Sequence, residues 1–261
     1  MIISNLFGYP IDSRMNFHNS NLKRTLKNLF RRPSNDVVVL EPNLGLGDNL
    51  ICLGLVRALS RSNPQKQFYY ACLHRCYQSL AWMFSDLNNV YLFAVSSGRE
   101  ARQLSGFLNA SYLPIGVEHV DIKRFDAYFY EQHNIHFDLR WSDAHTLPGP
   151  LSDALYEQCN PSHEPYILVC DQESGLVKYD LQIASLQNKK MIRVDALTNN
   201  IFDWTKLVLN ADEIHTIDTA FVHLVESLLY QKPAPALYYH LARNSPTEFT
   251  RRLPWQVVTY R

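Results

Sequence analysis

Short apolar runs alternate with longer segments that carry apolar residues at helical spacing along most of the chain. The apolar runs are four to seven residues long, as expected for buried strands of a parallel sheet. They cover residues 37–40, 67–73, 90–95, 166–171, 191–194 and 234–240, and residues 213–217 form a further strand candidate. The segments with helical spacing cover residues 49–62, 75–87, 99–110, 201–211 and 219–231. This alternation predicts an α/β fold in which helices connect parallel strands.

The pattern is less regular between residues 112 and 165. Residues 126–143 predict a helix that ends near Asn134, followed by a polar loop rich in histidine and tryptophan. Residues 147–165 contain four prolines and are typical of a connection between domains. We therefore expect two α/β domains facing a central cleft. Their expected bounds are 36–150 and 151–245, with a tail at 246–261 that packs back.

Residues 1–35 predict an arm that precedes the first domain. Its residues 22–32 place leucines and Phe30 at helical spacing among lysines and arginines, and Pro33 ends the helix. One interpretation is a surface helix whose leucines pack on the protein while its cations stay solvated. The other is peripheral contact with a membrane or an anionic partner. The sequence leaves both open.

Composition and charge exclude several classes of protein. A hydrophobic content of 46% excludes disorder, and 25 basic against 25 acidic residues argue against nucleic-acid binding. No apolar run approaches the roughly 20 residues of a membrane-spanning helix, and the first residues do not resemble a signal peptide. Five widely spread cysteines indicate a reducing compartment, so a cytoplasmic location is expected. Cys72 and Cys76 are interpreted as packing thiols, and we expect no metal site.

The first candidate site lies directly after the strand at 37–40. Gly45 and Gly47 let the backbone approach a ligand closely, and the helix that follows offers unpaired N–H groups. The motif is neither a dinucleotide fingerprint, because Leu50 replaces the last glycine, nor a phosphate-binding P-loop. Asp48 is placed either to cap the helix or to act as a general base toward a substrate hydroxyl. The two roles are compatible.

The second candidate site follows the strand at 213–217. Asp218 and Thr219 stand at a helix start, and Thr219, His223 and Glu226 form a polar stripe on an otherwise apolar helix. One interpretation is a capped helix with a satisfied core histidine. The other is a cradle for a diphosphate, with Asp218 or Glu226 contacting sugar hydroxyls.

Together these motifs resemble the GT-B glycosyltransferases of the heptosyltransferase type. The resemblance pairs the strand, Gly-x-Gly-Asp, helix unit near the amino terminus with the strand, Asp-Thr-x-x-x-His, helix unit near the carboxyl terminus, and spans about residues 37–240. Residues 129–141 are also similar to a segment of short glycosyltransferase-like proteins of viruses and bacteria. Ala220 departs from the pattern, because the family has glycine there.

The resemblance implies an enzyme that transfers a sugar from a nucleotide-diphosphate sugar to a glycan hydroxyl, in the synthesis of surface polysaccharides or glycoprotein glycans. The expected reaction is an inverting displacement that needs no metal or other cofactor. Asp48 matches the candidate base, and Asp218, Thr219 and His223 match the donor-binding region. The resemblance also implies that both α/β domains are Rossmann-like, in the GT-B architecture. The second domain would hold the nucleotide sugar, and the first would hold the acceptor.

The cation that stabilises the leaving diphosphate is not fixed by the motifs. Lys178, just beyond the strand at 166–171, is the first candidate, Arg140 the second and Arg243 the third. Arg140 and Trp141, with Gly45 and Gly47, are also candidates for acceptor contacts or loop structure. The chain has no Asp-x-Asp triplet, which is why a metal-held diphosphate is not expected.

Two other functions remain as alternatives. A nucleotide-sugar epimerase of the same fold would use the same cleft and consume donor without acceptor. A scaffold protein that binds nucleotide sugar without turnover is the second alternative, and Ala220 supports it. A serine hydrolase is excluded by the absence of a Gly-x-Ser-x-Gly elbow.

Overall fold

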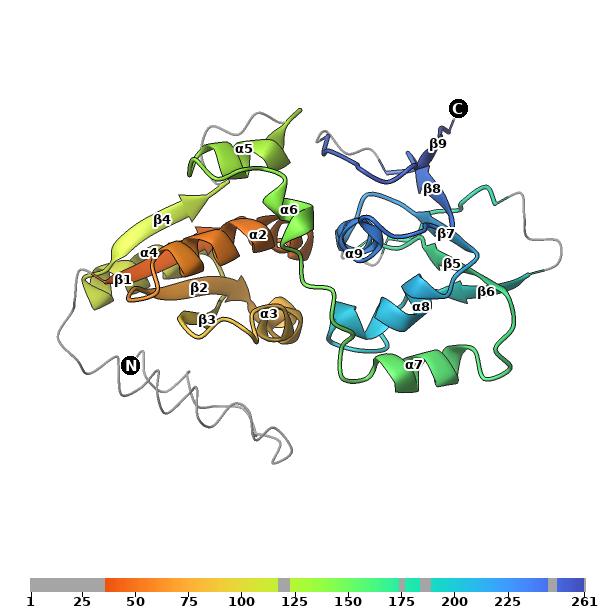
Figure 1. The fold of residues 1–261 in the computed structure, drawn as a ribbon, viewed down its shortest axis with the longest axis horizontal. Helices are drawn as coiled ribbons and strands as arrows, with labels where there is room; N and C mark the ends of the chain where they lie inside the picture. Colours follow the sequence, from red (N-terminus) through yellow and green to blue (C-terminus); the bar gives the residue numbers. More distant parts are fainter. Residues whose placement is uncertain (1–35, 117–122, 174–176, 184–188, 244–247, 261) are drawn as a thin grey trace.

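The computed structural model describes residues 36–116, 123–173, 177–183, 189–243 and 248–260. The predicted arm, with its basic helix, lies outside the described residues. Two parallel sheets stand side by side, each with its own helices, and helices α2, α6 and α9 lie between them (Figure 1). No helix within the described ranges combines the length and apolar character needed to cross a membrane.

The first unit is built on a four-stranded sheet with the order β3-β2-β1-β4, in which all neighbours are parallel. Its strands are β1 (Val37–Pro42), β2 (Gln67–Leu73), β3 (Val90–Val95) and β4 (Ser111–Ile115). Its helices are α2 (Leu46–Ser62), a 3-10 turn (His74–Cys76) that continues into α3 (Tyr77–Met83), and α4 (Gly98–Leu108). The strand order reverses between β1 and β4, and ligands bind at such a switch point in open α/β sheets.

The second unit is built on a five-stranded parallel sheet with the order β6-β5-β7-β8-β9. Its strands are β5 (Tyr166–Cys170), β6 (Lys190–Arg193), β7 (Glu213–Thr216), β8 (Ala236–His240) and β9 (Gln256–Val258). Its helices are α7 (Ser152–Cys159), a 3-10 turn (Ile201–Trp204) that continues into α8 (Thr205–Leu209), and α9 (Ala220–Leu229). Here the order reverses between β5 and β7.

Burial explains why strand β5 and most positions of helix α9 are apolar. All five residues of β5 are buried, as expected for a strand covered on both faces. Helix α9 is buried nearly all round because it packs against α8 in its own unit and against α2 and α6 of the first unit. Each large apolar side chain buried in this way contributes roughly 1.5–3 kcal/mol relative to an exposed one.

The structure corrects the prediction for residues 112–165. The helix predicted from residue 126 to near Asn134 is α5 (Phe125–Glu131), and the turn after it passes through Asn134 at a φ of 53°, which a helix cannot continue through. A second short helix, α6 (Leu139–Ser142), lies in the predicted polar loop. The predicted connection at 147–165 contains α7, which packs on α8 as part of the second unit.

Two strands were absent from the prediction. Strand β4 is an edge strand with only one buried residue, and it contains Pro114, which an edge position tolerates. Strand β9 lies in the predicted tail and adds a parallel edge to the second sheet. Both strands lack the apolar run on which the prediction relied.

Candidate functional site

A cavity of about 780 Å³ lies between the two units, at the carboxyl ends of their strands. Its size is in the range of small-molecule sites in proteins. The loops after β1, β4, β5, β6, β7 and β8 all contribute to its wall. The contributors used below are Gly45, Gly47, Asp48, Arg75, Glu173, Asp218, Thr219, Ala220, His223 and Arg243. Both candidate motifs of the sequence therefore meet at one cavity.

Asp48 lines the cavity from the first turn of α2, a helix that begins at Leu46 rather than at the predicted residue 49. A Cβ atom on Gly45 would lie 2.7 Å from Asp48 Oδ2, so the carboxylate folds back over the helix start. Burial, followed by the charge of Asp218, raises the pKa of Asp48 from 3.8 to about 7. Desolvation thus outweighs the helix dipole, which favours the ionised form. A carboxyl group with this pKa is suited to accept a proton near neutral pH.

Asn49 holds the loop that precedes Asp48. The sequence motifs did not single out Asn49. Its Nδ2 donates to the Gly45 carbonyl at 2.5 Å, and its Oδ1 accepts from the Tyr70 hydroxyl at 2.7 Å. Asn49 and Tyr70 are both completely buried. An asparagine at a helix start is typical of capping, so no local pattern indicated this contact with β2.

The start of helix α9 forms the opposite wall of the cavity. Thr219 caps the helix, because its hydroxyl accepts from the Phe221 amide at 3.3 Å. Arg243 Nη1 donates to the Asp218 carbonyl at 2.7 Å, and its Nε pairs with Glu173 at 2.8 Å. The helix amino terminus and the Arg243 guanidinium thus place positive charge on this wall, next to the carboxylates of Asp218 and Glu173.

His223 lies one turn along α9, at the point where the two units touch. A Cβ atom on Gly47 would lie 3.1 Å from the His223 Cδ2 atom and 3.5 Å from the Ala220 Cα atom. Glycine at position 47 therefore permits the close approach of α2 and α9. Burial, followed by the charge of Arg140, lowers the pKa of His223 well below 6.5, so its ring is neutral at pH 7.

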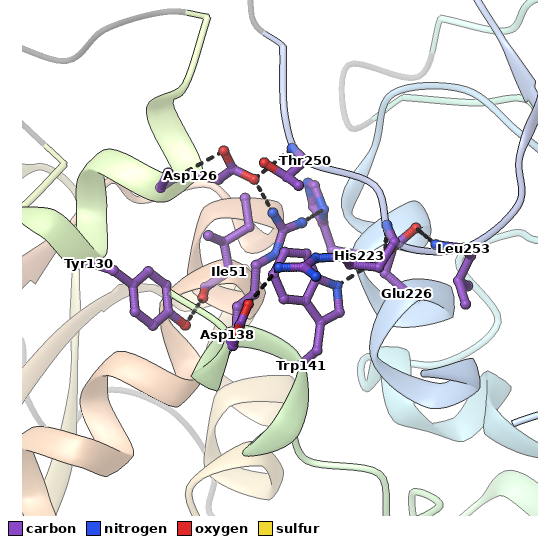
Figure 2. A network of polar contacts seen from close by, with 12 residues as sticks. Ile51, Asp126, Tyr130, Asp138, Trp141, His223, Glu226, Thr250 and Leu253 are labelled. Atoms are coloured by element: carbon purple, nitrogen blue, oxygen red, sulfur yellow. Dashed lines mark hydrogen bonds and ion pairs between the residues drawn. The ribbon is translucent and has the colours of Figure 1, made fainter. Parts of the chain in front are cut away.

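Arg140 and Trp141 do not line the cavity but lie in the interface between the units, where both contact α9. Figure 2 shows Trp141 beside Glu226 there. Arg140 is 3% exposed, forms an ion pair with Asp126, and contacts His223 Nδ1 at 3.1 Å. Trp141 Nε1 donates to Glu226 at 3.0 Å. The predicted contacts of Arg140 and Trp141 with an acceptor do not fit this placement, because both side chains are buried against protein groups.

The predicted role of Glu226 at sugar hydroxyls needs the same correction. Its carboxylate accepts from two indole N–H groups, those of Trp141 and Trp255, and from the backbone amides of Arg252 and Leu253 (Figure 2). Glu226 is 1% exposed and does not line the cavity. Its oxygens are occupied in attaching the carboxy-terminal segment to α9.

Lys178, the first candidate for the cation, is exposed and is not part of the cavity wall. Among the described residues, the arginines that line the cavity are Arg75 on the first unit and Arg243 on the second. Arg243 was the third candidate, and Arg75 was not considered because it stands in a segment predicted as an ordinary helix.

No group of three or more histidine, cysteine, aspartate or glutamate side chains suited to a metal ion occurs among the described residues. Cys72 and Cys76 are both buried thiols without a disulfide, in keeping with the predicted packing role. Burial raises the pKa of Cys72 to about 12, so this thiol is unreactive at neutral pH.

Comparison with known proteins gives matches in structure alone. No family of known sequences matches the chain, and no curated protein does. A glycosyl transferase of family 9 from Veillonella parvula DSM 2008 superposes with a TM-score of 0.55 at 10% identity, over 87% of each chain. The ADP-heptose lipopolysaccharide heptosyltransferase II of E. coli superposes with a TM-score of 0.57 at 14% identity, over 85% of this chain and 90% of that one. The predicted GT-B fold of two Rossmann-like domains is thereby confirmed.

Proposed function

We propose that the chain is a glycosyltransferase that moves a sugar from a nucleotide-diphosphate sugar to a glycan hydroxyl. The observation that carries the proposal is the Asp48 carboxyl, whose pKa is raised to about 7 in a cavity between the carboxyl ends of two Rossmann-like sheets. The likeness in fold to glycosyltransferases supports it. Glycan synthesis in the cytoplasm remains the setting that we propose.

In the proposed reaction Asp48 acts as the general base. An acceptor hydroxyl attacks the anomeric carbon while Asp48 takes its proton, so a new C–O bond forms and the bond from the anomeric carbon to the diphosphate oxygen breaks. The electron pair leaves with the nucleoside diphosphate. Attack from the face opposite the leaving group inverts the anomeric centre.

The second unit supplies the proposed donor site. The amino terminus of α9, with Thr219 as its cap, favours an anionic diphosphate, and Arg243 adds a cation on the same wall. Asp218 and His223 complete the donor side. The α9 amino terminus and Arg243 stabilise the departing charge without a metal ion, and the Asp218 carboxylate contacts sugar hydroxyls. The acceptor then occupies the first-unit wall, where Gly45, Gly47 and Arg75 lie.

Donor binding is tested by thermal denaturation in the presence of a panel of nucleoside diphosphates. A ligand at 100 times its dissociation constant adds about 2.7 kcal/mol to the unfolding free energy, which corresponds to several degrees in Tm. We expect Arg243→Ala to abolish this shift and Lys178→Ala, at an exposed lysine outside the cavity, to preserve it. A well-folded protein that responds to no nucleotide would refute the proposed donor site.

Transfer itself is tested with Asp48→Asn, which removes the base but keeps the shape of the side chain. We expect turnover to fall by roughly 10²–10⁴-fold while the nucleotide-dependent rise in Tm is retained. Donor consumption without acceptor would instead identify an epimerase. A variant that transfers sugar at the wild-type rate would show that Asp48 is not the base.

A further inference from the structure

The contact between Arg140 and His223 joins the two units next to the cavity, which His223 lines. Arg140 belongs to α6 of the first unit, and His223 belongs to α9 of the second. The distance from Arg140 Nη2 to His223 Nδ1 is 3.1 Å, and the contact is buried. Figure 2 shows His223 in this network together with Asp126 and Trp141.

The guanidinium of Arg140 is fixed from several directions. Asp126 forms an ion pair with it, and the same carboxylate accepts from the Thr250 amide at 2.7 Å. The guanidinium lies 4.7 Å from the centroid of the Trp141 ring. The His223 ring packs edge-on against Phe249, with 4.6 Å between centroids. Neither partner in the contact is therefore free to rotate away.

The chemistry of the two side chains determines the position of the proton on His223. An arginine side chain only donates hydrogen bonds, so Nδ1 of His223 must accept, and the proton of the neutral ring is carried by Nε2. The opposite edge of the ring lies beside Gly47 in the cavity wall, where a Cβ atom would be 3.5 Å from Nε2. The Nε2–H group of His223, a hydrogen-bond donor, thus lies on the cavity side of the ring.

We propose that Arg140 is a positioning residue that holds His223 in the Nε2–H tautomer, so that His223 donates a hydrogen bond to an oxygen of the bound nucleotide sugar. The inference rests on the proposed function for its ligand, but the tautomer is a property of the free protein. Arg140 and His223 come from different units. The Nε2–H tautomer of His223 is therefore held only when the two units are docked as in this structure.

The tautomer is measured directly by long-range ¹H–¹⁵N correlation spectra of the full chain labelled with ¹⁵N-histidine, without ligand. The His223 signals are identified by their loss in His223→Gln. We expect a neutral ring with its proton on Nε2 in the wild type. A ring protonated on Nδ1, or on both nitrogens, at pH 7 overturns the proposal, whatever becomes of the proposed function.

The role of Arg140 is tested with Arg140→Lys, which keeps a charge for Asp126 but not the planar fork that bridges Asp126 and His223. We expect a mixture of tautomers at His223 and an approximately tenfold weaker affinity for the nucleoside diphosphate that binds the wild type. The matched control is Trp141→Phe, which removes a hydrogen bond to Glu226 in the same interface and leaves the tautomer unchanged. An unchanged tautomer in Arg140→Lys overturns the proposal.

A double-mutant cycle separates positioning from a general structural effect. Glutamine places an amide N–H near the position of Nε2 without needing a tautomer, so His223→Gln should retain nucleotide affinity within a few-fold. In that background Arg140→Lys should have little further effect on affinity. Additive losses would refute positioning through His223. If no nucleotide binds the wild type, the proposed function fails, and the spectra still decide the tautomer.

Discussion

Asp48 is expected to destabilise the folded chain near neutral pH, and Asp48→Asn is expected to remove this effect. Burial and the charge of Asp218 raise the pKa of Asp48 from 3.8 to about 7. Since one pKa unit corresponds to 1.36 kcal/mol, a shift of about three units represents a destabilisation of at most about 4 kcal/mol. The folded chain binds the Asp48 proton more tightly than the unfolded chain does. The destabilisation is therefore absent below about pH 3.8, grows as the pH rises, and is complete above about pH 7.

The measurement is urea denaturation of the wild type and Asp48→Asn at pH 5.5 and at pH 8. Between these values the wild type passes through about 1.5 pH units of the titration, so the stability advantage of the variant should grow by about 2 kcal/mol. Asp153→Asn, at an exposed position, controls for the loss of a surface carboxylate. In the transfer assay kcat/KM should rise through about pH 7 as the base ionises. A stability difference that is equal at both pH values would refute a buried carboxyl with a raised pKa.

Three further changes test the fold and the site. Gly54→Ala should lower the unfolding free energy by roughly 1–3 kcal/mol or more, because the added Cβ would overlap the Leu139 carbonyl where α2 crosses α6. An unchanged midpoint of urea denaturation would contradict this close crossing. Glu226→Ala should lower the unfolding free energy by roughly 3–5 kcal/mol, because it leaves two indole N–H groups in the interface unpaired. Calorimetry on the folded fraction should show unchanged nucleotide affinity. A selective loss of affinity would instead place Glu226 in the donor site. Dialysis against EDTA should leave the transfer rate unchanged, because we propose that the α9 amino terminus and Arg243 stabilise the leaving diphosphate. Restoration of a lost rate by a divalent cation would overturn the metal-independent mechanism.

Local patterns in the sequence were sufficient to identify the two motifs that meet at the cavity. The strand before Gly45 is a largely apolar run, and the strand before Asp218 is buried at every position although Ile214 is its one apolar residue; each strand leads into a helix. Because parallel strands present their carboxyl ends at one edge, the loops that follow them gather on the same side of each sheet. The sequence thereby placed Asp48 and Thr219 on opposing walls of one cleft, and the structure shows both lining the same cavity.

Weakly apolar elements were beyond the reach of the same patterns. Strand β4 has a single buried residue, and β9 has none. Helices α6 and α7 are short, and they stand among polar residues and prolines. Such elements form because they complete a surface that the rest of the fold creates, so their own residues carry little signal.

The sequence by itself determined the α/β class, the division into two Rossmann-like domains and the chemistry available at the strand ends, because periodicity and helix starts are local properties. Only the tertiary structure decided which polar residues face the cavity. Glu226 and Arg140 had the residue types expected of ligand-binding groups, yet they are buried by partners 83 to 85 residues distant along the chain. Arg243 reaches the cavity whereas Lys178 remains exposed outside it. Burial and pairing depend on segments that only folding brings together, and for this reason the same burial also sets the raised pKa of Asp48.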